Sequence, residues 1–309
     1  MNFFKPKFWD KTEISFFSIM LSPVTLIIKI LAFLKRTLAT SYKCSIPIIC
    51  VGNIYLGGTG KTPMSIEIYK ILKNLNLKPA FIRKKYKSFQ DEANLQKKIG
   101  LTFQNKNRLM AINEAVQSKA NIAILDDGFQ DFSMEKNLSI VCFNEKQWIG
   151  NGLTIPSGPL REELSSLRRA DCVVINGRKN LNIENKIFNK NKEIKIFYTK
   201  YVPQNINEFK NKKIIAFAGI GNPESFFSLL IDNNINILKK IKFPDHYNFS
   251  KKEMEDLINL SQEKNATLLT TEKDYYRINK SYKNRVNFLK ILVEIKDQNK
   301  FIEEIKKII

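Results

Sequence analysis

The sequence predicts an α/β protein with a doubly wound sheet and a second, smaller α/β domain. Short apolar runs typical of buried strands alternate along the chain with stretches of helical period. A stretch dominated by Asn and Lys, residues 176–212, separates two such series and is predicted to be a linker. The predicted parts are an apolar N-terminal helix, a larger domain and a smaller domain, over residues 1–36, 37–200 and 201–309.

The N-terminal region is apolar but too short to cross a membrane. The uncharged run between Glu13 and Lys29 has 15 residues, whereas a spanning α-helix needs about 20. Phe, Trp and Lys residues precede it, as is typical of a helix that lies in the membrane interface. We therefore predict a membrane-interface helix. The alternatives are a helix packed on the protein's own core and a true membrane span.

The first series of elements covers the larger domain. Each predicted strand is a short apolar run, and the longer helices have apolar residues at spacings of three and four. The predicted strands are 45–51, 79–82, 121–125, 138–143 and 172–175, with a further one at 194–198. The predicted helices are 63–75, 109–118 and a short one at 160–169. Residues 83–107 are polar and without clear period, which predicts a loop.

The second series covers the smaller domain and repeats the alternation. The predicted strands are 214–218, 235–241, 267–271 and 286–293. Three helices are predicted. One begins at Pro223, one covers 251–261, and one lies at the end of the chain. No internal repeat is visible in either series.

The loop between the first strand and the first helix carries the strongest chemical signal. It consists of Tyr55, Leu56, Gly57, Gly58, Thr59, Gly60, Lys61 and Thr62. The pattern is G-x-x-x-x-G-K-[ST] with Tyr55 in place of the first glycine. Glycine backbone can approach phosphates, Lys61 can reach the β- and γ-phosphates, and the Thr62 hydroxyl can bind Mg²⁺. The loop therefore predicts a P-loop NTPase-like fold that binds ATP and Mg²⁺.

Two further places carry candidate catalytic groups. Asp126 and Asp127 end an apolar strand, where a doubly wound sheet places its ligands, and we predict that they hold Mg²⁺. The alternative is an ordinary acidic turn. His246, the one histidine of the chain, follows a predicted strand beside Asp245 and is a candidate acceptor for a hydroxyl proton. The alternative is a histidine without a function.

Charge and cysteine content narrow the class of protein. The 51 Lys and Arg residues against 30 Asp and Glu give a net charge of +21, which favours anionic partners. The alternative is that lysine is simply this protein's ordinary surface residue. The four scattered cysteines contain no C-x-x-C pair, which argues against a zinc site or a disulfide framework.

The motifs together resemble one family, the tetraacyldisaccharide 4′-kinases that phosphorylate the lipid A precursor of Gram-negative bacteria. Their shared order along the chain carries the resemblance. In the first half they are Val-Gly-Asn at 51–53, Gly-Gly-Thr-Gly-Lys-Thr-Pro at 57–63, Asp-Asp-Gly-Phe-Gln at 126–130, Gly-Asn-Gly at 150–152, Pro-Ser-Gly-Pro-Leu-Arg-Glu at 156–162 and Arg-Ala-Asp at 169–171. In the second half they are Ala-Gly-Ile-Gly-Asn-Pro at 218–223, Phe-Pro-Asp-His at 243–246 and Thr-Glu-Lys-Asp at 271–274.

The resemblance implies an activity and a location. It implies transfer of the γ-phosphate of ATP to the 4′-hydroxyl of a tetraacyldisaccharide 1-phosphate, which forms lipid IVA. It implies a peripheral enzyme at the cytoplasmic face of the bacterial inner membrane, with the lipid substrate, ATP and the membrane surface as partners. It also implies that Asp91 orients His246 as the catalytic pair, beside Lys61. Where the family usually has a histidine after Asp-Asp-Gly-Phe-Gln, this chain has Asp131.

Two other classes of function compete with this reading. One is a P-loop ATPase or GTPase switch that binds nucleic acid. The chain contains no Asn-Lys-x-Asp element and no recognised nucleic-acid motif, so we predict no nucleic-acid partner. The other is a membrane-associated nucleotide-binding protein without kinase activity.

Overall fold

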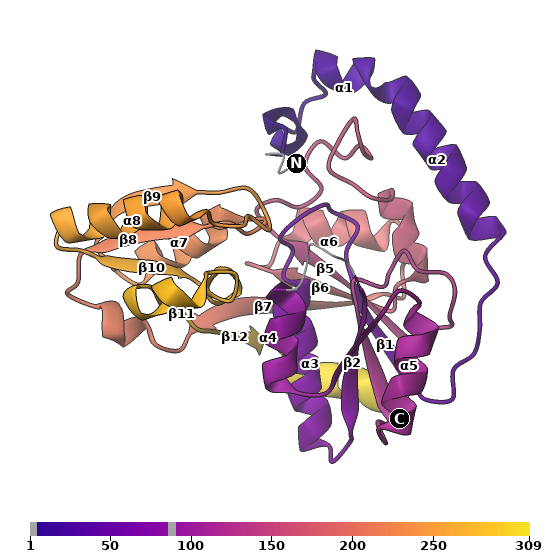
Figure 1. Ribbon diagram of the computed structural model, residues 1–309. Coiled ribbons are helices and arrows are strands. Elements are labelled where there is room, and N and C mark those ends of the chain that lie inside the picture. Colours follow the sequence, from indigo (N-terminus) through magenta and orange to yellow (C-terminus); the bar gives the residue numbers. More distant parts are fainter. Residues whose placement is uncertain (1–4, 86–90) are drawn as a thin grey trace. The chain divides into compact units, whose positions relative to one another are not determined.

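The computed structural model describes residues 5–85 and 91–309, Asp91 by its backbone alone, and the chain divides into two compact units (Figure 1). The larger unit contains Lys5–Lys85, Ile99–Lys200 and Glu294–Ile309. The smaller unit contains the described residues 91–98 and Tyr201–Val293. Neither unit is continuous in sequence, whereas the domains predicted from composition were single continuous ranges.

The larger unit is built on a mostly parallel sheet. Its strands are β1 (Ile48–Gly52), β2 (Pro79–Lys84), β3 (Thr102–Asn105), β4 (Ile122–Asp126), β5 (Leu138–Asn144), β6 (Cys172–Asn176), β7 (Lys195–Pro203) and β12 (Ile291–Ile295). The strand order is β12-β7-β6-β5-β1-β4-β2-β3, and the neighbouring strands from β7 to β3 pair in parallel. The order reverses beside β1, between β5 and β4. A doubly wound sheet binds ligands at such a reversal, at the carboxyl ends of its strands.

Helices cover both faces of this sheet. α3 (Lys61–Asn74) stacks Tyr69 on Phe81 of β2, with ring centroids 4.6 Å apart. α5 (Arg108–Gln117) and α6 (Leu181–Phe188) contribute to a core cluster that includes Ile82, the next residue of β2. Because successive residues of a strand face opposite sides, α3 lies on one face and α5 and α6 on the other. The last helix of the chain, α10 (Gln298–Lys306), packs Phe301 against Phe197 of β7.

The smaller unit is a four-stranded parallel sheet between helices. Its strands are β8 (Ile214–Ala218), β9 (Ile237–Lys242), β10 (Thr267–Thr271) and β11 (Asn287–Leu289), in the order β11-β10-β8-β9. α7 (Pro223–Asp232) packs on the face of β8 that carries Ala216, and α8 (Lys251–Glu263) on the face that carries Phe217. The remaining elements of this unit are α4 (Asp91–Ile99, to Lys98), α9 (Glu272–Tyr275) and the 3₁₀ turns η3 (Ile206–Phe209) and η4 (Lys280–Arg285).

Two polar segments are more ordered than their composition indicates. Residues 83–107, predicted as a loop, contain α4 and β3. The buried side of α4 includes Gln96 and Ala93, which give almost no apolar periodicity, and β3 is a half-buried edge strand. Residues 176–212, predicted as a linker, contain α6 and the strand β7. Ile183 and Ile187 form the buried stripe of α6 in an otherwise polar sequence.

The predicted strand 286–293 is two strands. β11 pairs with β10 in the smaller unit, whereas β12 belongs to the large sheet beside β7. Val293 and Ile295 alternate with exposed residues along β12, as expected for a strand with one buried face. A single apolar run therefore hid the point where the chain returns to the larger unit.

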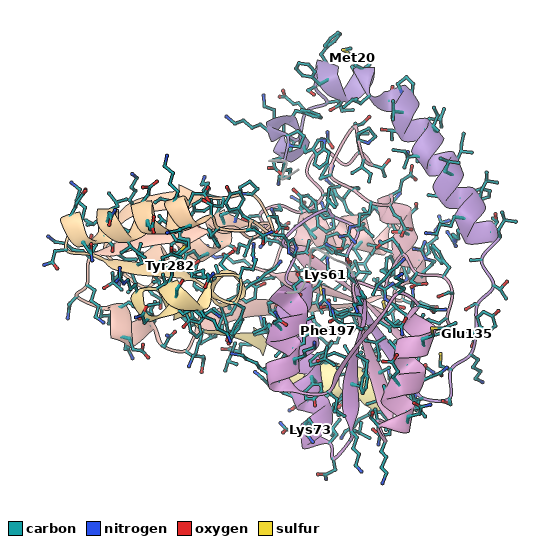
Figure 2. All side chains as sticks on the ribbon, in the orientation of Figure 1. Met20, Lys61, Lys73, Glu135, Phe197 and Tyr282 are labelled. Carbon is teal, nitrogen blue, oxygen red and sulfur yellow. The ribbon has the colours of Figure 1, made fainter. Side chains whose placement is uncertain are left out.

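The N-terminal helices expose their apolar side chains. α1 (Phe16–Met20) and α2 (Ser22–Thr37) follow the 3₁₀ turn η1 (Lys7–Asp10), and Figure 2 shows their side chains projecting around the ribbon. Phe16, Leu31 and Phe33 are each more than 60% exposed, so the helix is not packed on the core of the larger unit. None of the described helices is long and apolar enough to cross a membrane.

Candidate active site

The glycine loop joins the end of β1 to the start of α3. Gly57 and Gly60 have φ values of 116° and 92°, which side chains other than glycine rarely tolerate. Gly60 is also the residue that caps α3, so the helix begins at Lys61 with its first N–H groups at the loop. A helix N-terminus beside glycine backbone is a ready-made site for an anionic phosphate.

Asn53 fixes the shape of this loop. Its side-chain amide donates to the Thr59 hydroxyl at 3.0 Å and to the Tyr55 carbonyl at 2.5 Å, while its Oδ1 accepts from Lys61 Nζ at 3.1 Å. The Gln130 amide in turn donates to the Asn53 carbonyl at 2.9 Å. Neither residue was singled out by its chemistry in the sequence, because Asn and Gln side chains that brace a loop leave no periodic pattern.

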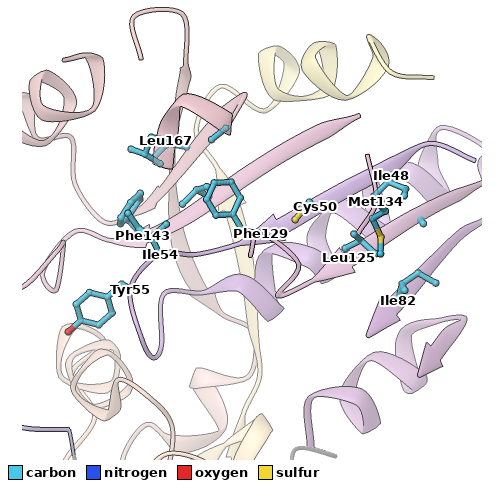
Figure 3. Packing of buried hydrophobic residues seen from close by; sticks show 14 of the residues in the cluster. Ile48, Cys50, Ile54, Tyr55, Ile82, Leu125, Phe129, Met134, Phe143 and Leu167 are labelled. Carbon is cyan, nitrogen blue, oxygen red and sulfur yellow. The ribbon is translucent and has the colours of Figure 1, made fainter. Parts of the chain in front are cut away.

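Tyr55, the residue in the place of the first glycine, belongs to the core. Its side chain is fully buried among the apolar residues that Figure 3 shows, and its hydroxyl points away from them. That hydroxyl donates to Asp10 at 2.7 Å and accepts from Lys5 Nζ at 2.7 Å. Only the backbone of Tyr55 is therefore left to line a ligand site, while its side chain ties the loop to the N-terminal segment.

Asp127 lies between two cations. Its Oδ1 atom is 3.3 Å from Lys61 Nζ and accepts a hydrogen bond from Arg161 at 2.8 Å. Burial alone would raise the pKa of the Asp127 carboxyl, but the charges of Lys61 and Arg161 outweigh it and hold the pKa well below its usual range. Asp127 has a φ of 58°, so its backbone adopts the left-handed conformation that Asp and Asn tolerate better than most residues.

Asp126 connects the acidic strand end to the glycine loop. It is buried at the end of β4, forms an ion pair with Arg83 from β2, and accepts a hydrogen bond from the Thr62 hydroxyl at 3.3 Å. Because β1, β4 and β2 are parallel neighbours, their carboxyl ends bring these three residues together. A P-loop threonine beside a strand-end carboxylate is the donor set that holds Mg²⁺ in P-loop NTPases, so the residues present fit this ion.

Asp131 takes part in a supporting contact. Arg108 donates to the Asp131 carboxylate at 2.6 Å and to the Asp127 carbonyl at 2.8 Å. Burial alone would raise the pKa of Asp131, but hydrogen bonds from Ser133 and Arg108 lower it, so the carboxylate is charged at neutral pH. Asp131 thus holds Arg108 against the backbone of the acidic turn.

The smaller unit holds a second polar cluster, centred on His246. Lys273 Nζ lies 3.2 Å from the His246 Nε2 atom. A lysine ammonium can only donate, so this contact makes Nε2 an acceptor and leaves the imidazole proton on Nδ1. His246 has a φ of 56°, and its backbone N–H donates to the Gly219 carbonyl at 3.1 Å. The turn after β9 is therefore tied to the end of β8.

The start of α4 supplies a carboxylate to this cluster. Glu92 Oε1 is 2.9 Å from Lys273 Nζ and 4.0 Å from His246 Nε2. Asp91, predicted as the partner of His246, is the first residue of α4, and its side chain lies outside the described part of the chain. Among the described residues, the carboxylate that α4 places beside His246 is that of Glu92, and the role of Asp91 stays a prediction.

A buried carboxylate fixes the ends of β8 and β10 beneath this cluster. Asp274 accepts from the Gly219 N–H at 3.0 Å and the Thr271 hydroxyl at 2.7 Å, and it pairs with Arg277 at 2.7 Å. Burial raises the pKa of Asp274, although the charge of Arg277 acts in the opposite direction. Arg277 also donates to the Gly219 carbonyl at 2.9 Å.

Comparison with known proteins places the chain in a family. The family profile described as tetraacyldisaccharide-1-P 4′-kinase matches residues 17–309. The chain belongs to the tetraacyldisaccharide-1-P 4′-kinase family. Relatives named tetraacyldisaccharide 4′-kinase include one from Pelagibacter ubique, 41% identical and covering 100% of this chain and 99% of the relative. Another, from Rickettsia canadensis, is 36% identical over 98% of this chain and 96% of the relative.

A solved structure of similar fold comes from the same family. It is LpxK from Aquifex aeolicus in complex with ATP, 24% identical, with a TM-score of 0.72 over 94% of this chain and 99% of that one. The predicted α/β class, with a P-loop NTPase-like sheet and a second α/β part, is confirmed, and so is the predicted membership of the kinase family.

Replacing Asp127 by asparagine tests the charge balance of this kinase site. Asparagine keeps the shape and tolerates the φ of 58°. The lowered pKa means that the ionised Asp127 stabilises the fold above the carboxyl's ordinary pKa of 3.8, and this contribution is lost as the pH falls below that value. We expect the variant to be less stable than the parent at pH 7, with a gap that narrows below pH 3.8. Urea unfolding at pH 7 and at a pH below 3.8 measures the difference in the free energy of unfolding between parent and variant. A difference that is independent of pH would contradict the assignment.

Proposed function

We propose that this chain transfers the γ-phosphate of ATP to the 4′-hydroxyl of a tetraacyldisaccharide 1-phosphate at the cytoplasmic face of the bacterial inner membrane. The product is lipid IVA. The observation that carries the proposal is the convergence of Lys61, Thr62, Asp126 and Asp127 at the carboxyl ends of β1 and β4 in a member of this kinase family.

The glycine loop supplies the groups that phosphoryl transfer needs. This reaction depends on aligned reactants and on neutralised phosphate charge rather than on covalent catalysis. The backbone of residues 55–60 and the first N–H groups of α3 would bind the phosphates. Lys61, now 3.3 Å from Asp127, can exchange this carboxylate for a phosphate oxygen, and Arg161 keeps Asp127 paired when it does.

Thr62, Asp126 and Asp127 are the residues that would hold Mg²⁺. Thr62 and Asp126 already lie within hydrogen-bond distance of each other. Mg²⁺ is commonly bound by one or two protein carboxylates together with substrate phosphates, so not all three side chains are required as direct ligands. When bound, the ion would neutralise charge on the phosphates.

His246 is the group that we assign to the acceptor hydroxyl. The contact with Lys273 leaves Nε2 without a proton, which is the state that can accept one. Glu92 pairs with Lys273 at 2.9 Å, so its negative charge offsets the ammonium charge beside Nε2. We extend the same supporting role to Asp91 as the sequence predicted.

The activity assay uses the full chain with γ-labelled ATP, Mg²⁺ and tetraacyldisaccharide 1-phosphate in detergent micelles. Label on the lipid is the expected result, with an active relative run alongside. A second sample with the disaccharide lacking the 4′-hydroxyl should stay unlabelled. Absence of label on the intact lipid while the relative is active would disprove the proposed reaction.

We also propose that α1 and α2 bind the membrane surface. Their exposed apolar side chains include Phe16, Leu31 and Phe33, and Lys29 forms an ion pair with Glu163 at 2.5 Å. Hydrogen bonds between the Thr25 and Ser157 hydroxyls at 2.7 Å and between the Asn151 amide and Ser18 at 3.2 Å join the helices to the larger unit. An apolar helix docked through polar contacts leaves its apolar surface for lipid.

The double variant Leu31→Asp and Phe33→Asp tests this membrane contact. We expect binding to phospholipid vesicles to fall about tenfold or more, because each change removes apolar area that the membrane would bury and adds a charge. The matched control is Asn182→Asp with Asn185→Asp, which adds the same charge at exposed positions of α6. Vesicle cosedimentation measures the binding. Equal binding by the two double variants would contradict the proposal.

A further inference from the structure

A lysine-lined cavity lies within the smaller unit, and neither the kinase reaction nor the membrane contact uses it. Its volume is about 610 Å³, which is within the range of small-molecule sites. Four of the residues that line it are lysines, Lys97, Lys98, Lys280 and Lys283, and none of its described lining residues is acidic. We call this cavity the lysine pocket.

Two of these lysines, Lys98 and Lys283, come from different elements and contact the same aromatic ring. Lys98, on α4, places its ammonium 4.1 Å from the centroid of the Tyr276 ring. Lys283, on η4, lies 5.5 Å from the same ring and 5.0 Å from that of Tyr275. Aromatic faces attract cations, so the Tyr276 ring stabilises two ammonium groups that repel each other.

Among the described residues, no ion pair compensates the positive charge of the lysine pocket. Elsewhere on the surface, lysines such as Lys200 and Lys307 pair with glutamates at 3.0 and 2.7 Å. In the pocket, partial burial lowers the pKa of Lys283, and the charges of Lys98 and Lys280 lower it further. The negative charge of an anion bound among these groups would act against both causes of the lowered pKa of Lys283.

We propose that the lysine pocket is a second anion site that binds a phosphate-bearing small molecule with at least two negative charges. Four ammonium groups are enough to neutralise the negative charge of a phosphomonoester or a diphosphate. The side-chain amides of Asn94 and Asn279 add hydrogen-bond donors for the phosphate oxygens. Lysine binds phosphate as a point charge, and none of the described lining residues is an arginine, so the pocket would attract the ligand by charge rather than by bidentate recognition. The phosphate belongs either to a soluble molecule or to a phospholipid headgroup.

Residue-resolved lysine acetylation of the full chain tests this proposal. Brief acetylation at pH 8, followed by mass spectrometry, gives a separate rate for each lysine. Because its pKa is lowered, Lys283 should react faster than the exposed Lys252 and Lys264. Inorganic pyrophosphate at about ten times its Kd should slow Lys98 and Lys283 about tenfold, in proportion to the unoccupied fraction, and leave Lys252 and Lys264 unchanged.

Parallel arms distinguish the two sources of phosphate. Vesicles of phosphatidylcholine, with and without phosphatidic acid, whose headgroup is a phosphomonoester, replace pyrophosphate in the second arm. Protection by pyrophosphate supports a soluble ligand, and protection by phosphatidic acid vesicles alone supports a lipid headgroup. Protection in neither arm, or equal protection of the control lysines, overturns the proposal. The rate at Lys61 in the same spectra reports the glycine loop separately, so failure of the lysine pocket and failure of the kinase site are distinguishable.

Discussion

Replacing Lys61 by alanine is expected to reduce kcat by about 10³-fold or more, the largest effect of any single substitution in this chain. Lys61 begins α3 and contacts both Asn53 and Asp127. Its loss removes a charge that would bind the transferring phosphate, and it removes one of the two cations that keep Asp127 ionised. Steady-state phosphorylation of the lipid at saturating ATP measures the change.

A matched control is available on the same helix. Lys73 is exposed at the other end of α3 (Figure 2), so Lys73→Ala makes the same chemical change away from the loop. This variant should keep its turnover. A Lys61→Ala protein that is folded by circular dichroism and retains kcat near that of Lys73→Ala would refute the assigned role.

The sequence predicted well those parts of the fold that rest on apolar periodicity. The central strands β1, β4 and β5 are wholly buried, so each appears as a largely apolar run. The glycine loop was predictable because a strained backbone that must approach phosphate leaves glycines at fixed spacing. In contrast, α4 buries Gln96 in place of an apolar residue, and no periodicity reveals such a helix.

The candidate site was predicted only as far as its residues carry a pattern. Asp126 and Asp127 were predicted from their place at the end of an apolar strand, but their partners Arg83 and Arg161 come from another strand and a loop. Which arginine meets which carboxylate depends on the strand order β1-β4-β2, which a single sequence does not reveal. The pairing of Glu92 with Lys273 beside His246 was equally unpredictable, because the two residues lie far apart in sequence.

Replacing His246 by asparagine is expected to lower kcat by about 10²-fold, with little effect on the KM for ATP. Asparagine tolerates the φ of 56° and preserves the turn after β9, but it has no basic nitrogen to accept the hydroxyl proton. Steady-state phosphorylation of the lipid at saturating acceptor compares kcat and the KM for ATP of the variant with those of the parent enzyme.

Chemical rescue separates a catalytic histidine from one that only shapes the turn. Glycine also adopts a φ of 56° without strain, so His246→Gly removes the ring and leaves the backbone in place. Because Lys273 and Glu92 still flank the vacated position, added imidazole can take the place of the ring and accept the proton. Partial recovery of kcat with imidazole is therefore the expected result. Activity of His246→Asn at the parent level, or a loss that imidazole leaves unchanged in His246→Gly, would assign the histidine to the turn alone.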